Sequence, residues 1–179
     1  GRLIFLKTLK TERLILREWR ESDAADLYEI SKSPNVLMAG AKVHESIDES
    51  LACIQSYIQS QEIWAIVLKK KKKKPIGWIG LYNTNRHDKY KEVEFVVSEN
   101  YQNKGYATEA VKQILRYAFG ELDIMVVAVC HYPRNVKSKR VIEKCGFTYE
   151  GTLRKYSKNL SDSVRYSMTK EEWENLNNL

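Results

Sequence analysis

The chain has 179 residues, of which 43% are hydrophobic, and these values predict one globular domain over residues 1–179. A chain of this size buries roughly 70% of its unfolded surface, so its core requires neither disulfides nor a structural metal. The formal net charge is +7, but six positive charges lie in the run 69–74 and the rest carries only +1, which argues against an extended basic face for nucleic acid.

The N-terminal part of the chain is predicted to form a strand and two helices. Residues 13–19 alternate apolar and polar side chains, and a period of two favours a strand. Ser22 is a predicted N-cap for a short helix that stops before Pro34. The sequence from Ser46 to Glu49 has the pattern of a capping box, which predicts the start of a second helix.

The middle of the chain is predicted to form a hairpin, which strands and helices follow. Residues 63–68 and 76–82 are rich in Trp, Ile and Val and flank the lysine run, so they predict a hairpin with a charged tip. The order of all segments predicts one mixed α/β domain. The later elements are a strand at 92–97, a helix at 105–119 closed by Gly120, a buried strand at 124–130, a helix from the N-cap Asn135 to residue 144, a strand pair at 147–154 and 164–168, and a last helix capped by Thr169.

The cysteines and the apolar runs predict where the protein works. Cys53, Cys130 and Cys145 are odd in number and widely spaced, which favours a reduced, cytoplasmic compartment over a disulfide framework. The three histidines show no metal-ligand spacing, so we expect no metal. The longest apolar run, residues 124–130, is far shorter than the ~18 residues of a membrane span, and the apolar core of residues 1–7 is too brief for a signal peptide.

The most informative segment leads from a predicted strand, through a polar turn, into the helix that begins near Gly105. A helix start carries unpaired N–H groups and about half a positive charge, which favours an anion. The glycine lets a ligand approach the main chain, and Lys104 adds positive charge. An ordinary turn is the alternative, because one glycine is a weak signal. The residues that could wrap a diphosphate are Gln102, Asn103, Lys104, Gly105, Tyr106, Ala107 and Thr108.

Three spaced motifs together are similar to those of a known family. Gln102-Asn-Lys-Gly-Tyr-Ala107 matches the phosphate-loop pattern Gln/Arg-x-x-Gly-x-Gly/Ala. Asn135-x-x-Ser138 is followed by a Glu-Lys-x-Gly-Phe sequence, and Thr11-Glu-Arg-Leu-Ile-Leu-Arg17 precedes both. With these motifs the sequence resembles the GNAT superfamily of acyl-CoA N-acyltransferases, and within it the RimJ/RimL-type branch. The resemblance extends from about residue 10 to residue 168.

The resemblance implies an acetyl-CoA site in a central, mixed, mostly antiparallel and strongly twisted sheet that helices flank. Acetyl-CoA would lie where two parallel strands, residues 92–97 and 124–130, splay apart. The implied contacts are the main chain of Phe95 and Val97 for the pantetheine arm, residues 102–108 for the diphosphate, and Asn135 and Ser138 for the wall near the thiol. Taken singly, the last two also fit a plain helix cap and a first-turn hydroxyl.

Acetyl transfer to an amine requires a neutral amine, a polarised thioester carbonyl and a proton for the departing thiolate. The resemblance implies that the main-chain N–H near Val97 polarises the thioester carbonyl. Glu92 and Glu94 share one strand face, where like charges raise a carboxyl pKa, so either is a candidate base. Two solvated carboxylates, with water as the base, are the alternative. Ile142 stands where many GNAT enzymes have a tyrosine. The resemblance therefore implies that Ser138 is the acid that protonates the departing thiolate.

The pKa of the amine indicates a substrate class. An α-amine of pKa ~8 is about 10% neutral at pH 7, whereas a lysine side chain near 10.4 is neutral below ~0.1%. A site without an assured base therefore suits a protein N-terminus or a small-molecule amine better than a lysine. Ser157 stands where some ribosomal-protein acetylases carry a glutamate, which argues against a ribosomal substrate. We predict an N-acetyltransferase that works by direct attack.

Two alternatives to this prediction stay open. The lysine run suits a solvated hairpin tip, but it would also suit a non-catalytic CoA-fold module that binds RNA or the ribosome. Acidic residues such as Asp48 and Glu49 are compatible with an aminoglycoside or polyamine acceptor. The expected partners are acetyl-CoA and an amine acceptor, without a membrane or nucleic acid. Relatives of this kind are often dimers, so a homodimer stays open.

Overall fold

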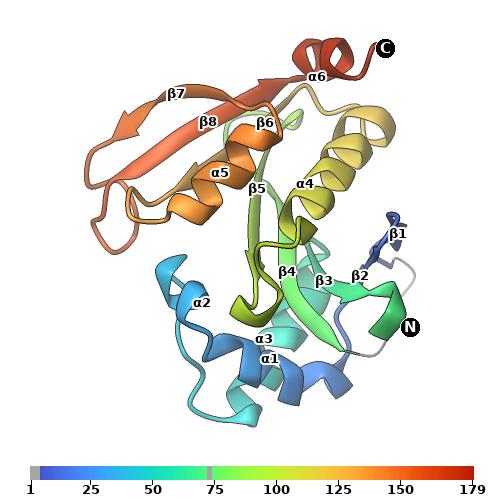
Figure 1. The fold of residues 1–179 in the computed structure, drawn as a ribbon, viewed down its shortest axis with the longest axis vertical. Coiled ribbons are helices and arrows are strands. Elements are labelled where there is room, and N and C mark those ends of the chain that lie inside the picture. The colour runs from blue at the N-terminus through green and yellow to red at the C-terminus, as the bar shows by residue number, and fades with distance from the viewer. Residues whose placement is uncertain (1–4, 72–73) are drawn as a thin grey trace. The chain divides into compact units, whose positions relative to one another are not determined.

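The computed structural model describes residues 5–71 and 74–179, and its strands form a mixed sheet (Figure 1). Its elements are β1 (Leu9–Lys10), β2 (Leu14–Glu18), α1 (Ala24–Ser31), α2 (Pro34–Met38), α3 (Ile47–Ser60), β3 (Ile63–Leu68), β4 (Pro75–Asn83), β5 (Tyr90–Val97), α4 (Tyr106–Arg116), β6 (Val126–His131), α5 (Val136–Lys144), β7 (Thr148–Leu153), β8 (Ser163–Thr169) and α6 (Lys170–Leu176). The strand order is β1-β2-β3-β4-β5-β6-β8-β7. The pair β5–β6 is parallel, whereas β1–β2, β2–β3, β3–β4, β6–β8 and β7–β8 are antiparallel, which confirms the predicted fold class.

The chain divides into two compact units, which we describe separately. One unit consists of the described residues up to Gly80 together with Phe95–Ala110. The other consists of Leu81–Glu94 and Val111–Leu179. Because β4 and β5 each contribute residues to both units, the division does not fall at a linker. A single domain over the whole chain stays a prediction.

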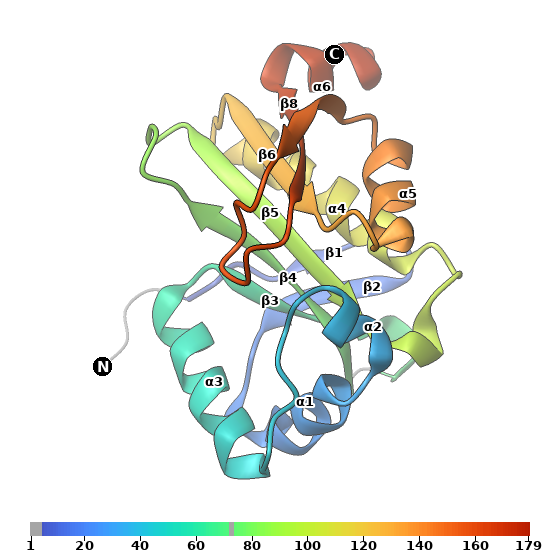
Figure 2. The same ribbon diagram turned by 90° about the vertical axis from the view of Figure 1, so that its left-hand side faces the viewer.

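The first unit is built on β2, β3 and β4. All six residues of β3 are buried, and β3 pairs with β2 (Leu14 opposite Leu68) and with β4 (Ile63 opposite Gly80). A strand covered on both faces reads as a continuous apolar run, as the sequence of β3 does. Helix α3 contacts both α1 and β3, so these helices close the core of the unit (Figure 2).

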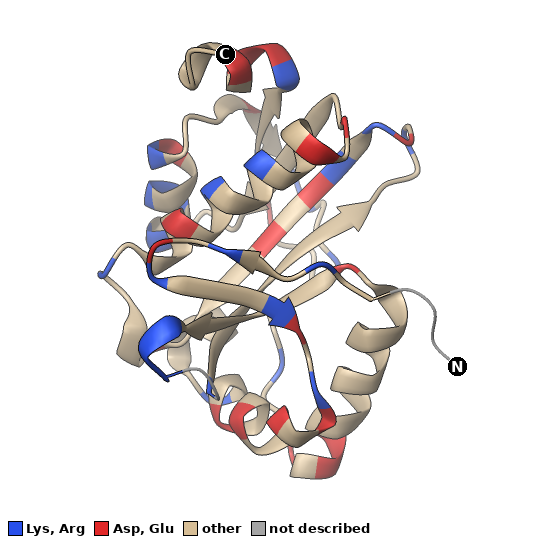
Figure 3. Cartoon of the chain, turned by 90° about the vertical axis from the view of Figure 1, so that its right-hand side faces the viewer, with Lys and Arg blue, Asp and Glu red and all other residues tan. Residues whose placement is uncertain are grey.

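The predicted hairpin with a charged tip is confirmed for the described residues. A short 3-10 turn, Lys69–Lys71, follows β3, and its lysines appear in blue at the tip in Figure 3. Lys74 is exposed, and Lys72 and Lys73 of the predicted run lie outside the described residues.

The second unit is built on β6, β7 and β8. β8 pairs with β6 over six residues, from Val126 opposite Thr169 to His131 opposite Val164, and it also pairs with β7. The first part of β5 lies on the other side of β6. The predicted caps are confirmed here, since Asn135 accepts from Ser138 N–H and Thr169 forms a capping box. In the described ranges, no helix combines the length and apolar character that crossing a membrane demands.

The start of α1 differs from the prediction. Ser22 does not cap α1, because a 3-10 turn, Glu21–Asp23, precedes the helix and α1 begins at Ala24. The cause is the buried carboxylate of Asp23, which binds the guanidinium of Arg17 at 2.8 and 2.9 Å. The same carboxylate accepts the main-chain N–H of Arg20 at 2.8 Å and so fixes the turn.

Four further local features differ from the prediction. Strand β1 and helix α2 were not predicted, because they are short and Pro34 was read only as a stop. At the first position of a helix a proline loses no hydrogen bond, and Pro34 begins α2 in this way. Helix α4 ends at Arg116 and continues as a π turn, Tyr117–Glu121. Glu49 accepts the N–H of Glu45 at 2.8 Å, so the predicted capping box on α3 keeps only its serine half.

We predict that Gly77→Ala destabilises the first unit. A Cβ on Gly77 of β4 would lie 2.0 Å from the carbonyl oxygen of Val96 and 2.9 Å from Cα of Val97. These are main-chain atoms of β5, which cannot rotate aside, so the free energy of unfolding should fall by about 2–3 kcal/mol. Urea denaturation measures the change. Gly120→Ala is the matched control, since its Cβ would meet Trp173 at an ordinary 3.7 Å. Equal effects of the two substitutions would contradict the prediction.

Candidate active site

The segment between β5 and α4 carries the residues predicted to bind a diphosphate. Asn103 and Gly105 have φ angles of +61° and +81°, so the chain makes two left-handed turns just before the helix. The N–H of Glu109 donates to the carbonyl of Gly105 at 3.0 Å, and this is the first hydrogen bond of α4. The amides of Gly105, Tyr106 and Ala107 therefore have no acceptor within the helix.

The exposure of this segment fits an anion. Asn103, Lys104 and Gly105 are exposed, whereas Tyr106 is buried and anchors the first turn of α4. Gln102, Ala107 and Thr108 are half-buried at the two ends of the segment. An accessible main chain, a glycine in the left-handed region and an adjacent lysine are the features that a diphosphate requires. The residues present therefore fit the diphosphate of acetyl-CoA.

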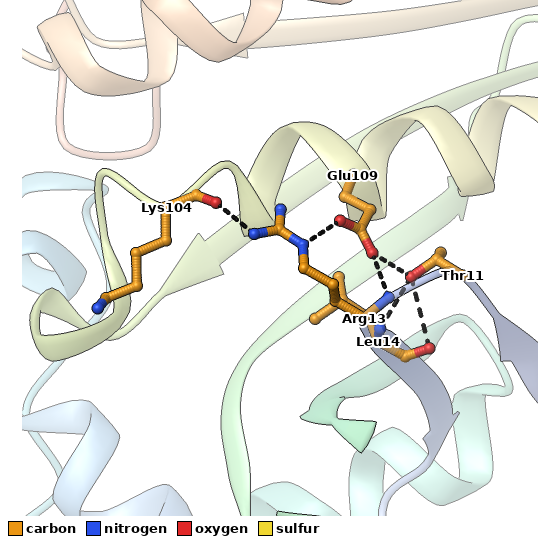
Figure 4. A network of polar contacts seen from close by, with 5 residues as sticks. All are labelled: Thr11, Arg13, Leu14, Lys104 and Glu109. Carbon is orange, nitrogen blue, oxygen red and sulfur yellow. Dashed lines mark hydrogen bonds and ion pairs between the residues drawn. The ribbon is translucent and has the colours of Figure 1, made fainter. Parts of the chain in front are cut away.

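A network of polar contacts ties this loop to the β1–β2 turn (Figure 4). The guanidinium of Arg13 donates from Nη1 to the carbonyl oxygen of Lys104 at 2.8 Å and from Nε to Oε1 of Glu109 at 2.7 Å. The other carboxylate oxygen of Glu109 accepts the main-chain N–H of Arg13 at 2.9 Å and a short hydrogen bond from the Thr11 hydroxyl. Arg13 also lies over the ring of Tyr106, 4.5 Å from its centroid.

These contacts lower the pKa of the Glu109 carboxyl group. Partial burial works against the charged carboxylate, but the hydrogen bonds from Thr11 and from both the main chain and the side chain of Arg13 outweigh it. The pKa of Glu109 is therefore lowered from its ordinary value of 4.5. The carboxylate stays ionised and is fully engaged in this network.

The end of β5 directs the main chain of the two predicted pantetheine contacts away from β4. The N–H of Ser98 donates to the carbonyl of Ile76 on β4 at 2.8 Å. Because peptides are trans and strand residues alternate, the carbonyl and the N–H of Val97 point away from β4. Phe95, two residues earlier, presents its main chain on the same side. The predicted pantetheine contacts thus share one edge of β5.

The sequence analysis missed a side chain that occupies part of this edge. The carboxamide of Asn35, on α2, donates a short hydrogen bond to the carbonyl oxygen of Val97. Its carbonyl oxygen accepts a short hydrogen bond from the hydroxyl of Ser33, and this hydroxyl in turn accepts the N–H of Glu99 at 2.9 Å. The carbonyl of Val97 is therefore satisfied within the protein, whereas its N–H stays directed away from β4. No sequence pattern signals a contact across 62 residues.

The predicted bases lie in the second unit. Glu92 is opposite Ala128 in the parallel ladder, which ends where Val93 is opposite Val129. Glu92 is half-buried and Glu94 is exposed. The side chain of Cys130 lies on the same face of the sheet as Glu92, because it is two residues beyond Ala128. The carboxylate of Glu92 contributes to a raised pKa of the Cys130 thiol, after the larger effect of burial.

The predicted acid lies on α5, in the same unit. Asn135 is buried and accepts the N–H of Ser138 at 3.1 Å, so it caps the helix as well as standing where the family motif places it. Ser138 is half-buried in the first turn of α5. Burial raises the pKa of Tyr166, which is opposite Val129, and the negative charge of Glu143 on α5 raises it further. Helix α5, which also contacts β6, therefore lies on the face of the sheet that carries Val129, opposite to the face of Glu92.

A buried histidine follows on β6. His131 is only 7% exposed, and its Nδ1 lies 2.7 Å from the carbonyl oxygen of Tyr132. Its Nε2 is buried without a hydrogen-bond partner in the described part of the chain. Its ring packs against Tyr166, with centroids 5.7 Å apart, so His131 lies on the face that α5 covers. The sequence analysis counted this residue only among the three histidines without metal-ligand spacing.

None of the three cysteines has the features of a nucleophile. Burial is the largest cause of a raised pKa at Cys53, Cys130 and Cys145, and the value reaches about 12 at Cys145. No disulfide links them. At neutral pH these side chains are therefore thiols and not thiolates.

We predict that the network around Glu109 stabilises the protein in a pH-dependent way. A carboxyl whose pKa is lowered by folding contributes stability above its unfolded pKa, and this contribution disappears as the pH falls through the folded pKa. Glu109→Gln should therefore lower the free energy of unfolding at pH 7 and at pH 5, and by a smaller amount below pH 4.5. Urea denaturation at each pH measures the difference. Glu29→Gln is the control, because Glu29 pairs with Lys32 at 3.7 Å on the exposed surface. A difference that is constant with pH would contradict the prediction.

Comparisons with known proteins identify the family of the chain. A profile of the family described as Acetyltransferase (GNAT) domain matches residues 13–148. The uncharacterized N-acetyltransferase YnaD of Bacillus subtilis (strain 168) is 31% identical over 170 residues, which cover 92% of this chain and 98% of YnaD. The spermidine N(1)-acetyltransferase of Vibrio cholerae is 24% identical over 142 residues, which cover 79% of this chain and 82% of that protein.

The fold has close counterparts among solved structures. The acetyltransferase (GNAT family) from Bacillus anthracis superposes with a TM-score of 0.82 and 24% identity over 93% of this chain and 100% of that chain. This likeness bears on the fold alone. The family profile covers well over half of the chain, and YnaD is similar along nearly its whole length. The chain therefore belongs to the GNAT family and is an acetyl-CoA-dependent acyltransferase.

Proposed function

We propose that the protein transfers the acetyl group of acetyl-CoA to a primary amine by direct attack, and that the acceptor is a protein N-terminus or a small-molecule amine. The observation that carries this proposal is the exposed loop before α4, where Gly105 is left-handed and the first amides of the helix have no acceptor within it. Membership of the RimJ/RimL-type branch is part of the proposal, and the spaced motifs in the sequence support it. A cytoplasmic location is part of the proposal, and the unlinked cysteines support it.

The chemistry requires no covalent enzyme intermediate. The main-chain N–H of Val97 polarises the thioester carbonyl and stabilises the oxyanion that forms as the amine nitrogen attacks. Glu92 accepts the proton that the amine loses, directly or through water, with Glu94 as the exposed alternative. The C–S bond breaks, and Ser138 donates a proton to the departing thiolate, which becomes the thiol, while the serine hydroxyl regains a proton from solvent. The product is the N-acetylated amine, in which the acetyl group forms an amide.

The two proton-transfer groups lie on different faces of the sheet, and this supports their roles. Glu92 lies on the face that carries Cys130, whereas α5, with Ser138, covers the opposite face. An amine that arrives from the first face would lose its proton there, and the thiolate would take up a proton on the second. Two separate groups can then act in one reaction without exchanging protons with each other.

A polyamine is a second candidate acceptor. The observation that favours it is the similarity to the spermidine N(1)-acetyltransferase of Vibrio cholerae over most of both chains. Exposed acidic residues at the start of α3, Asp48 and Glu49, offer the negative charge that a polycation prefers. A polyamine amine is almost fully protonated at pH 7. This acceptor therefore depends more strongly than an α-amine on Glu92 as the base that removes a proton.

The donor site is tested by Gly105→Glu. The new carboxylate would repel the diphosphate, and a side chain at a φ of +81° is strained, so the affinity for CoA should fall by more than about 100-fold. Isothermal titration calorimetry measures it. The control is Gly151→Glu, which introduces the same charge at another glycine of positive φ, 147°, where a Cβ would meet no atom within 4 Å. Normal CoA binding by the Gly105 variant would show that the loop does not hold the diphosphate.

The acceptor is identified by thiol release from acetyl-CoA in the presence of N-terminal peptides, ribosomal proteins, amino acids, polyamines or aminoglycosides. The mass of each product gives the acetylated group. Release with α-amines and not with polyamines would support the first candidate, and the reverse would support the second. No release with any amine would contradict the proposal.

We predict that Cys130 is not an acetyl carrier. Its thiol has a raised pKa because of burial, so it is a weak nucleophile. Cys130→Ala should keep kcat within about twofold of the wild type, because direct attack uses no enzyme thiol. Steady-state kinetics with the acceptor found above measures this, and intact-protein mass spectrometry after mixing with acetyl-CoA alone should show no added acetyl group. A stable acetyl adduct that Cys130→Ala removes would mean a two-step reaction.

A further inference from the structure

We propose that Arg13 is a positioning residue that sets the orientation of the loop amide facing the diphosphate, an inference that rests on the proposed donor site. Arg13 lies between β1 and β2, outside the loop, and 43% of its side chain is exposed. Its guanidinium nevertheless contacts two parts of the donor segment, the main chain of Lys104 and the side chain of Glu109. Figure 4 shows it between them.

The contact with Lys104 acts on the loop through the peptide plane. Nη1 of Arg13 holds the carbonyl oxygen of Lys104 at 2.8 Å. In a trans peptide the carbonyl and the following N–H point in opposite directions, so the N–H of Gly105 is directed away from Arg13. Figure 4 shows that the Lys104 side chain also extends away from the network. Arg13 thus fixes an N–H direction that the flexible backbone of a glycine would not fix by itself.

The contact with Glu109 makes this arrangement rigid and electrically neutral. Glu109 lies in the first turn of α4, where an unpaired carboxylate would repel a bound phosphate. Both of its oxygens are engaged, by Arg13 on one side and by Thr11 and the main chain on the other. The charge of Arg13 is therefore balanced by Glu109, and its contribution to donor binding is orientation rather than attraction.

The glycine at 105 has a second role in this arrangement. A Cβ there would lie 3.2 Å from Nη2 of Arg13, closer than an ordinary contact. The absence of a side chain therefore leaves room for the guanidinium as well as for a ligand.

The role of Arg13 is tested by Arg13→Lys. A lysine keeps the positive charge, but its single ammonium lacks the planar fork that reaches Lys104 and Glu109 together. We expect CoA to bind at least about tenfold more weakly by calorimetry. Pantetheine, which lacks the diphosphate, should keep its affinity within about twofold by ligand-observed NMR. Arg86→Lys, at an exposed arginine of the β4–β5 connection, is the control and should bind both molecules normally.

The pair of ligands separates positioning from a general structural role. If Arg13 only stabilised the fold, Arg13→Lys would weaken the binding of CoA and of pantetheine by the same factor. Alternatively, it would lower the unfolding temperature without changing the ratio of the two affinities. If Arg13→Lys does not fold, Glu109→Gln is the second variant, because it keeps the shape but removes the charge that holds the guanidinium. The loss of the carboxylate charge alone would favour an anionic ligand, so weaker CoA binding with unchanged pantetheine binding would show that the orientation of the loop amide was lost.

The outcomes distinguish this inference from the proposed function. Wild-type protein that binds no CoA would overturn the donor site itself. Wild-type protein that binds CoA, together with an Arg13→Lys variant of unchanged CoA affinity, would overturn only the role of Arg13.

Discussion

The main chain at the junction of β5 and α4 must satisfy its hydrogen-bonding groups without a complete strand or helix around them. The parallel ladder ends at Val93, whereas β5 continues to Val97. A side chain from α2 satisfies the carbonyl of Val97, and the first amides of α4 have no acceptor inside the helix. A ligand with a thioester carbonyl and a diphosphate offers acceptors of the kind that these N–H groups require.

Charge at this junction is arranged so that an acidic residue does not oppose an anionic ligand. Glu109 is suited to the first turn of a helix, but near a diphosphate its charge would be unfavourable. Arg13 balances that charge while Lys104 stays exposed. In the proposed donor site, the attraction for phosphate would therefore depend on one lysine and on main-chain dipoles, and the proposal does not need the larger lysine run of the β3–β4 hairpin.

Sequence analysis predicted the elements whose cause is local. The strand β3 follows from its apolar run, and the caps Asn135 and Thr169 follow from the pattern of the next three residues. The start of α1 was predicted wrongly, because Asp23 is held by a buried arginine and not by a helical preference. Helix α2 was missed because Pro34 marks both an end and a beginning.

The candidate site likewise combines one local feature with contacts between distant parts of the sequence. The loop at residues 102–108 was predicted from its glycine and from the family motif, and the exposed left-handed turn fits the prediction. The contacts of Arg13 with Glu109 and of Asn35 with Val97 join residues 96 and 62 positions apart. No periodicity or spacing within one segment carries such information, since only the folded sheet brings these residues together. The roles of Glu92, Glu94 and Ser138 stay predictions.

The titration of the cysteines has a practical consequence for measuring this enzyme. A colorimetric reagent that counts sulfhydryl groups reacts with the thiolate, and burial raises the pKa of all three protein thiols. Free coenzyme released in solution ionises more readily than these buried groups. The dye will therefore record turnover against a low and slowly changing background, even at the high enzyme concentrations that a poor substrate demands.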